Sequence, residues 1–121
     1  IFNHIPYWKM VKYGDDPNDL SNMPWSKFKE KLKRIFIHNY DLLNEGGIYA
    51  VFVGDWRSGG QLIPITAETT LLGIECGFMF WDEAIKLTSE MKSKPLQEYR
   101  AKKFGYFAQM YDTLLIFKKK G

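Results

Sequence analysis

The sequence LLNEGGIYAVFVGD, residues 42–55, carries the clearest fold signal in the chain. Its centre, residues 48–53, is continuously apolar and rich in β-branched and aromatic side chains, as in a strand that is covered on both faces. Gly46 and Gly47 precede this segment and suit the end of a helix, because glycine enters the left-handed region at little cost. The stretch therefore predicts a helix, a tight turn and a buried strand that ends at Gly54 and Asp55.

The residues before this strand predict an amphipathic helix over 24–44. Lysine and arginine side chains alternate there with a stripe of apolar residues at helical spacing. Pro24 suits the first turn, where its missing N–H has no intrahelical partner. The apolar stripe consists of Trp25, Phe28, Leu32, Ile35, Phe36, Leu42 and Leu43.

The residues after the strand predict a turn, a second helix and two more strands. Residues 59–61 suit the turn, residues 64–76 the helix, and residues 78–87 and 111–118 the strands. The connection over 88–109 exceeds the roughly 12 to 15 residues beyond which unstructured loops are uncommon, and loops of that length tend to be functional or disordered. This order of elements indicates half of an open α/β sheet, in which ligands lie at the carboxyl ends of the strands.

Composition narrows the class of protein. With 121 residues, of which 45% are hydrophobic and 26% charged, the chain suits one domain or part of one and is unlike disordered proteins. No apolar run approaches the roughly 20 residues that span a bilayer, so we expect no membrane contact. The single cysteine, Cys76, fits a reducing compartment, and we expect the cytoplasm. The net charge of +3 permits a polyanionic partner.

The opening segment NHIPYW, residues 3–8, follows a short strand tail at Ile1 and Phe2. Pro6 restricts the backbone, and Tyr7 and Trp8 offer rings on which a planar group can stack. Such a ledge suits a nucleobase that has been flipped out of a duplex. The alternative is that both rings are simply buried in the core.

Together these motifs resemble the amino-directed DNA methyltransferases, which modify adenine N6 or cytosine N4. The resemblance implies a partial Rossmann-like class I methyltransferase sheet with flanking helices and a terminal antiparallel hairpin. By this resemblance, residues 1–121 are a single fragment of that domain. The fragment runs from the family's Asp/Asn/Ser-Pro-Pro-Tyr motif to the last hairpin of its sheet. The matching segments are residues 6–8 (PYW), 11–15 (VKYGD), 18–21 (NDLS), 42–55, 77–78 (GF), 81–82 (WD) and 111–118.

The resemblance also implies a catalytic motif. In the family, the first motif residue and a backbone carbonyl held by the prolines accept hydrogen bonds from the target amino group, and the aromatic residue stacks on the base. These roles fall on His4, Ile5, Pro6 and Tyr7, of which His4 and Ile5 depart from the family's residue types. A neutral imidazole can accept one hydrogen bond, whereas a protonated one repels a developing ammonium. The alternative for His4 is a polar strand-end residue with a backbone partner.

S-adenosylmethionine is the cofactor that the resemblance implies. The family binds it on a glycine-rich loop after a first strand, and neither pair of adjacent glycines here, at 46–47 and 59–60, has the spacing of such a loop. We therefore expect the cofactor-binding half in a longer polypeptide or on another subunit, with a homo-oligomer as a further arrangement. We expect no metal site, because Asp15, Asp16 and Asp19 lack the regular ligand alternation of a metal loop.

DNA is the partner that the resemblance implies, and two sets of residues could contact it. Trp8, Asp55 and Arg57 lie at predicted strand ends, although an ion pair between Asp55 and Arg57 is the commoner arrangement of neighbouring charges. The long connection offers cations for phosphate contacts, with a solvated loop as the alternative. These cations are Lys94, Arg100, Lys102 and Lys103.

The resemblance thus implies methylation of the exocyclic amino group of adenine or cytosine in DNA, as part of a larger enzyme of the restriction–modification kind. The alternative is a non-catalytic remnant that keeps the fold and acts as a DNA-binding or interaction module. His4 and Ile5 favour the remnant, whereas the Tyr7–Trp8 pair and the Gly54–Asp55 strand end favour the enzyme.

Overall fold

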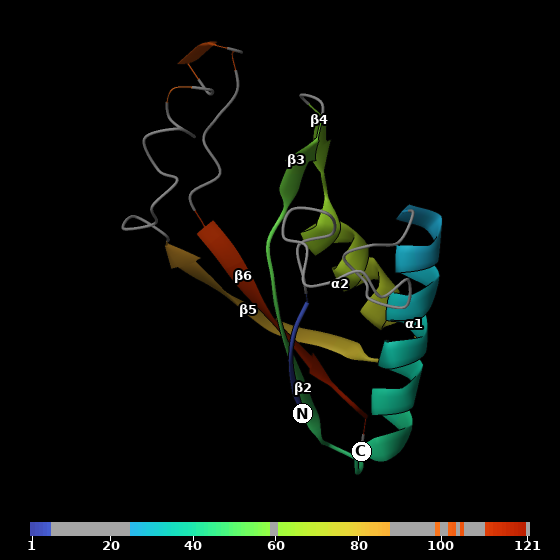
Figure 1. Cartoon of the computed structure of the whole chain (residues 1–121). Helices are drawn as coiled ribbons and strands as arrows, with labels where there is room; N and C mark the ends of the chain where they lie inside the picture. The colour runs from blue at the N-terminus through green and yellow to red at the C-terminus, as the bar shows by residue number, and fades with distance from the viewer. Residues whose placement is uncertain are drawn as a thin grey trace.

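A computed structural model describes residues 1–5, 25–58, 61–87, 99, 102, 103, 105 and 111–120, with backbone alone at 25 and 56–58. Figure 1 shows the chain. The elements in order are β1 (Phe2–His4), α1 (Trp25–Leu42), β2 (Ile48–Val53), β3 (Trp56–Ser58), β4 (Gln61–Ile63), α2 (Ile65–Glu75), β5 (Met79–Leu87) and β6 (Tyr111–Lys118).

Four strands form the main sheet in the order β1-β2-β6-β5, and β3 and β4 form a separate antiparallel pair. β1 is parallel to β2, whereas β6 is antiparallel to both β2 and β5. The predicted fold class, a partial α/β sheet with flanking helices and a terminal antiparallel hairpin, is confirmed. The β3–β4 pair was not predicted: Gln61, expected in a turn, begins β4, and β1 runs to His4 where a strand tail was expected only at Ile1 and Phe2.

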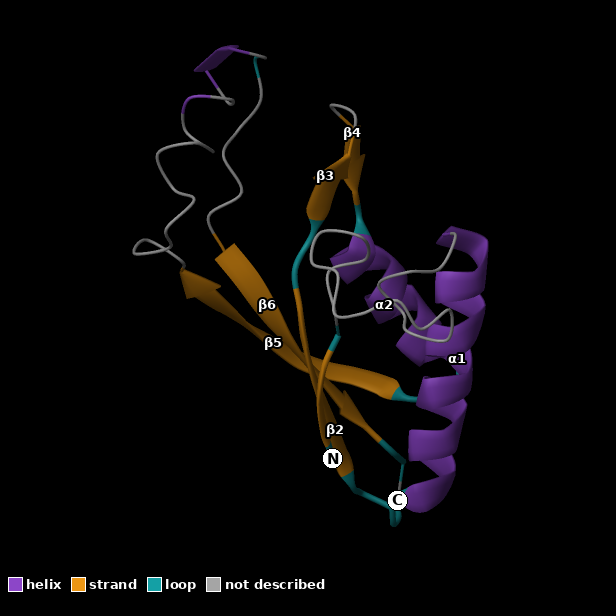
Figure 2. Cartoon of the chain, in the orientation of Figure 1, coloured by secondary structure: helices purple, strands orange, loops and turns teal. Residues whose placement is uncertain are grey.

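Both helices lie on the same face of the main sheet (Figures 1 and 2). Alternate β2 residues Tyr49, Val51 and Val53 are buried on this face, whereas Ile48, on the other, is 42% exposed. The expectation that β2 is covered on both faces is therefore not met within the described residues. Continuous apolarity indicates two apolar faces, but it does not reveal which part of a polypeptide supplies each cover.

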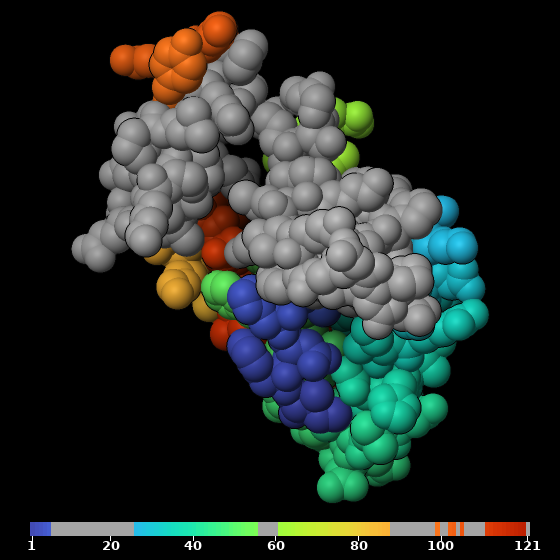
Figure 3. Space-filling view, viewed as in Figure 1, coloured from blue at the N-terminus to red at the C-terminus, as the bar shows by residue number. Residues whose placement is uncertain are grey.

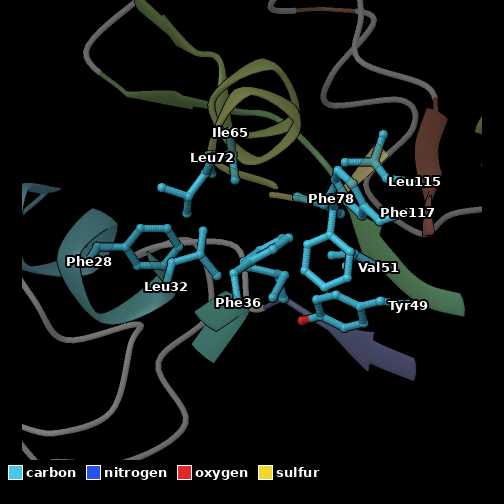
Figure 4. Packing of buried hydrophobic residues seen from close by; sticks show 12 residues of the cluster. Phe28, Leu32, Phe36, Tyr49, Val51, Ile65, Leu72, Phe78, Leu115 and Phe117 are labelled. Atoms are coloured by element: carbon cyan, nitrogen blue, oxygen red, sulfur yellow. The ribbon is translucent and has the colours of Figure 1, made fainter. Parts of the chain in front are cut away.

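Phe36 of α1 lies at the centre of the core (Figure 4). Its ring meets those of Tyr49 and Phe117 edge-to-face, with centroids 5.1 Å and 5.4 Å apart, and that of Phe78 at 6.2 Å. Such geometry adds to the free energy of apolar burial. The fully or nearly buried core residues are Ile5, Phe28, Leu32, Phe36, Tyr49, Val51, Val53, Ile65, Leu72, Phe78, Leu115 and Phe117.

The carboxyl end of α1 is fixed to the end of β6 by Lys119. Its Nζ donates to the backbone oxygens of Tyr40 at 2.8 Å and Leu43 at 3.0 Å, and lies 4.5 Å from the Tyr40 ring centroid. A cation at this end of a helix satisfies carbonyls that have no intrahelical partner and complements the helix dipole. Gly46, with φ of 77°, makes the turn into β2.

Gly73 on α2 allows this helix to pack closely against Phe117 of β6. A Cβ at this position would lie 2.2 Å from Cε1 of the Phe117 ring, which is itself fully buried. We expect Gly73→Ala to lower the free energy of unfolding by about 1–3 kcal/mol, as overpacking does, although alanine is normally the better helix former. Urea denaturation measures the change. Ile74→Ala, at an exposed position of the same helix, should shift stability far less, and a stabilised Gly73→Ala protein would contradict the packing described here.

The buried hydroxyl of Tyr49 makes the free energy of unfolding depend on alkaline pH. Burial raises the pKa of its hydroxyl from the ordinary 10.0 to about 12, so folding favours the neutral phenol. The resulting contribution to stability is complete below pH 10 and is lost as the pH rises through 12. Between pH 8 and pH 11, wild type should therefore lose about 1 kcal/mol more of its free energy of unfolding than Tyr49→Phe does. Urea denaturation at both pH values tests this, with exposed Tyr111→Phe as the control that should follow wild type.

Candidate functional site

The parallel pairing of β1 with β2 brings two distant parts of the sequence to the same end of the sheet. His4 lies beside Phe52 in the register, and the Ile5 N–H donates to the Phe52 carbonyl at 3.0 Å. His4 is the last residue of β1 and Ile5 follows it, while the Gly54–Asp55 segment follows β2, so these residues lie at the carboxyl ends of adjacent parallel strands. Ligands of open α/β sheets lie at such an end, so this end of the sheet is the candidate site.

His4 projects from the sheet face opposite the helices. Its side chain is exposed, and its ring meets the Phe52 ring edge-on at 5.1 Å between centroids. The ammonium of Lys86, on β5, lies 5.8 Å from the centroid of the same Phe52 ring. The imidazole thus rests against an apolar ring with a cation on the same face, and its nitrogens can serve as hydrogen-bond acceptors only when unprotonated.

Ile5 is fixed by its backbone and its side chain. The side chain is 2% exposed and belongs to the hydrophobic core. Its N–H makes the ladder bond to Phe52, which a proline could not make because proline has no N–H. A proline would fix the backbone here by restricting φ. Ile5 instead fixes it through this hydrogen bond and the burial of its side chain.

Asp55 has a structural role that was not predicted from the sequence. Its Oδ1 accepts the backbone N–H of Thr66, in the first turn of α2, at 2.7 Å. This hydrogen bond caps the helix from outside it, where Pro64, the cap residue itself, has no side chain able to do so. Proline at a helix cap is the signal that could have indicated an external acceptor.

Asn3, Asn39 and Tyr49 form a second group that the sequence analysis missed. Asn3 Oδ1 accepts from Asn39 Nδ2 at 2.9 Å and from the Tyr49 hydroxyl at 2.5 Å. Asn39 is 7% exposed and Tyr49 is fully buried. The signal was an asparagine on the buried stripe of α1, three residues after Phe36, because a polar side chain there needs a partner.

The other predicted site residues are placed only in part. Pro6, Tyr7, Trp8, Lys94 and Arg100 lie outside the described residues, as does the side chain of Arg57. Lys102 and Lys103 are exposed, and the Lys103 ammonium lies 5.8 Å from the Tyr99 ring centroid. In Figure 3 this segment lies well apart from the N-terminal residues. The structure therefore groups His4, Ile5 and Asp55 but does not bring Lys102 and Lys103 to them.

The described residues do not supply a cofactor cradle. Gly46 and Gly77 follow helices and Gly105 lies in the β5–β6 connection, so no described glycine of positive φ links a parallel strand to a following helix. A loop of that kind is what binds nucleotide-like cofactors in open α/β sheets. The same part of the chain contains no cluster of three metal-ligating side chains. It also contains no helix long and apolar enough to cross a membrane.

Comparison with known proteins supports the fold assignment. No family model and no curated protein matches the chain. Solved structures of TTHA0409 from Thermus thermophilus, provisionally described as a DNA modification methylase, are similar. One matches with 18% identity and a TM-score of 0.70, covering 99% of this chain and 45% of that one. A second, complexed with S-adenosyl-L-methionine, matches with 19% identity and a TM-score of 0.66, covering 100% and 44%.

A selenomethionine form of the same protein matches with 21% identity and a TM-score of 0.62, covering 80% of this chain and 38% of that one. The chain therefore spans less than half the length of the structures it resembles. At these identities the similarity concerns the fold. The described residues share the α/β fold of part of these structures.

Proposed function

We propose that this chain forms the target-base part of a DNA amino-methyltransferase that methylates the exocyclic amino group of adenine or cytosine. The observation that carries the proposal is the position of His4 and Ile5 at the carboxyl end of β1, beside the carboxyl end of β2. The proposal is further supported by a fold similar, over almost the whole chain, to that of a provisionally described DNA modification methylase solved with S-adenosyl-L-methionine.

The residues of this chain would act by accepting hydrogen bonds and by positioning. A neutral His4 imidazole accepts one hydrogen bond from the amino group of a flipped base, and the Ile5 carbonyl accepts a second. Tyr7 stacks on the base and Trp8 borders it. S-adenosylmethionine, when bound by its own half of the enzyme, supplies the electrophilic methyl group. The two acceptors, the His4 imidazole and the Ile5 carbonyl, bind the two N–H groups of the amine. This orients the lone pair of the amino nitrogen toward the methyl carbon.

The cofactor-binding half is the partner that the proposal requires, in the same polypeptide or on another subunit. Three observations support this requirement. Among the described strands β1 pairs only with β2, the face of the sheet opposite the helices is partly exposed, and the described residues supply no cofactor cradle. In this proposal residues 1–121 are a single fragment of the domain, and a homo-oligomer is one way to complete it.

DNA contacts beyond the flipped base are assigned to the cations of the long connection. Lys102 and Lys103 are exposed, as phosphate contacts require, and Lys94 and Arg100 complete the set. Arg57, next to the strand end, is a further candidate. Asp55 is bound to the α2 backbone and so is assigned the role of holding the β2 end in place.

The non-catalytic remnant is the second candidate function. It is favoured by the two departures from the family motif, His4 and Ile5, and by the missing cofactor cradle among the described residues. The two candidates differ in one measurable respect, because both predict salt-sensitive DNA binding but only the enzyme transfers a methyl group.

Methyl transfer from labelled S-adenosylmethionine to a duplex library, assayed with the complete protein, tests the proposal. We expect His4→Ala to lower kcat on the order of 100-fold, the usual cost of removing one acceptor or donor at a reacting group. His4→Asp should retain activity, because aspartate is a residue type of the family motif and accepts the same hydrogen bond.

His38→Ala is the matched control, since this second histidine is exposed on α1 and should leave kcat unchanged. Equal activity of wild type and His4→Ala would remove His4 from the catalytic site. Salt-sensitive DNA binding without any methyl transfer by wild type would establish the remnant.

A further inference from the structure

Three polar side chains, Asn3, Asn39 and Tyr49, meet directly beneath the candidate site, and we call this group the polar junction. They come from β1, α1 and β2, and their common point is the Oδ1 atom of Asn3, which accepts one hydrogen bond from each of the other two. Asn3 immediately precedes His4. The junction therefore joins three elements one residue away from the atoms proposed to meet the substrate.

The orientation of the Asn3 amide is fixed by its hydrogen bonds. Its carbonyl oxygen has two lone pairs, and both are used by the donors from Asn39 and Tyr49. Its Nδ2 donates to the backbone carbonyl of Phe2 at 3.1 Å. In this arrangement Asn39 Nδ2 and the Tyr49 hydroxyl donate inward and the Asn3 carbonyl oxygen accepts both hydrogen bonds, so the amide is held on each side.

The junction restrains β1 in a direction that the sheet does not. β1 has three residues and, among the described strands, pairs with β2 alone. Ladder hydrogen bonds fix its register and spacing in the plane of the sheet, whereas the bond from Asn39 fixes it against the helix layer. Ile5, buried on the same face, is anchored by its N–H bond to Phe52. His4 lies between these two anchors and points to the opposite face.

Stability alone does not account for this choice of residues. An apolar group of the same shape can replace a buried polar cluster at little cost in stability, because each polar group loses its hydration on burial. What a fully satisfied polar network adds is a single defined geometry. A defined geometry has most value where atoms must meet a substrate at a fixed distance and angle.

We propose that Asn3 is a positioning residue: held by Asn39 and Tyr49, it sets the direction in which His4 and the Ile5 carbonyl meet the target amino group. The inference rests on the proposed methyltransferase function. It assigns to the polar junction a catalytic consequence without contact between its side chains and the base.

Tyr49→Phe tests the inference with the smallest change, because it removes one donor to Asn3 and leaves the ring in the core. We expect kcat for methyl transfer to fall on the order of 10-fold, with KM for DNA and for S-adenosylmethionine unchanged. The reason is that a slightly misdirected acceptor reduces the stabilisation of the transition state but does not reduce substrate binding. Asn3→Leu, which removes the acceptor itself, should lower kcat further.

Thr69→Val is the matched control. Thr69 is fully buried, and its hydroxyl donates to the Ile65 carbonyl within α2 at 2.7 Å, so the change removes one buried hydrogen bond away from β1. Both single variants should lower the melting temperature by a few degrees. Only Tyr49→Phe should lower kcat when both are assayed well below that temperature.

The outcomes separate this inference from the proposed function. An active wild type whose Tyr49→Phe and Thr69→Val variants have equal kcat overturns the positioning role and leaves the function standing. A Tyr49→Phe variant with a raised KM and an unchanged kcat overturns it as well, because that pattern indicates binding. A wild type that transfers no methyl group overturns the proposed function, and the inference with it.

Discussion

The parallel hydrogen-bonded pairing of β1 with β2 determines where everything else of functional interest lies. It places His4 beside Phe52 and fixes the Ile5 backbone, although the two strands are separated by more than 40 residues that include all of α1. Parallel neighbours require a long crossover, and α1, within the described part of that crossover, packs on the sheet. Without this pairing, the N-terminal motif and the Gly54–Asp55 strand end would have no common edge.

The core explains why this edge is well supported. Phe36 of α1 packs against Tyr49 of β2 and Phe117 of β6, so the helix holds the two central strands from one side. Tyr49 contributes its ring to that cluster and its hydroxyl to Asn3, which links apolar packing to the geometry of β1. The opposite face has no cover from the described helices, and it carries His4, Phe52 and Lys86. One face thus carries the described hydrophobic core, and the other carries the residues of the proposed site.

Much of the fold could be predicted because hydrophobic periodicity is a local signal. The spacing in 24–44 and the apolar run in 48–53 predicted α1 and β2, and residues 111–118 predicted β6. The Asp55 cap on Thr66 and the polar junction could not be predicted in the same way, since each depends on how distant segments meet. Pro64 and Asn39 were local anomalies that indicate an external partner without naming it. Roles for Tyr7 and the loop cations stay predictions, because Tyr7, Lys94 and Arg100 lie outside the described residues and Lys102 and Lys103 lie apart from His4.

In the proposed enzyme the carboxyl end of β1 receives the target base. Photo-cross-linking of the complete protein to two duplex libraries, one carrying 5-iodocytosine and one carrying a photoreactive adenine analogue, followed by mass spectrometry of the attached peptides, measures this contact directly for either target base. The account predicts attachment within residues 4–8, at the histidine and aromatic residues that border the proposed base site. Attachment confined to the exposed side of α1 or to the β5–β6 hairpin, with none in residues 4–8, would contradict it.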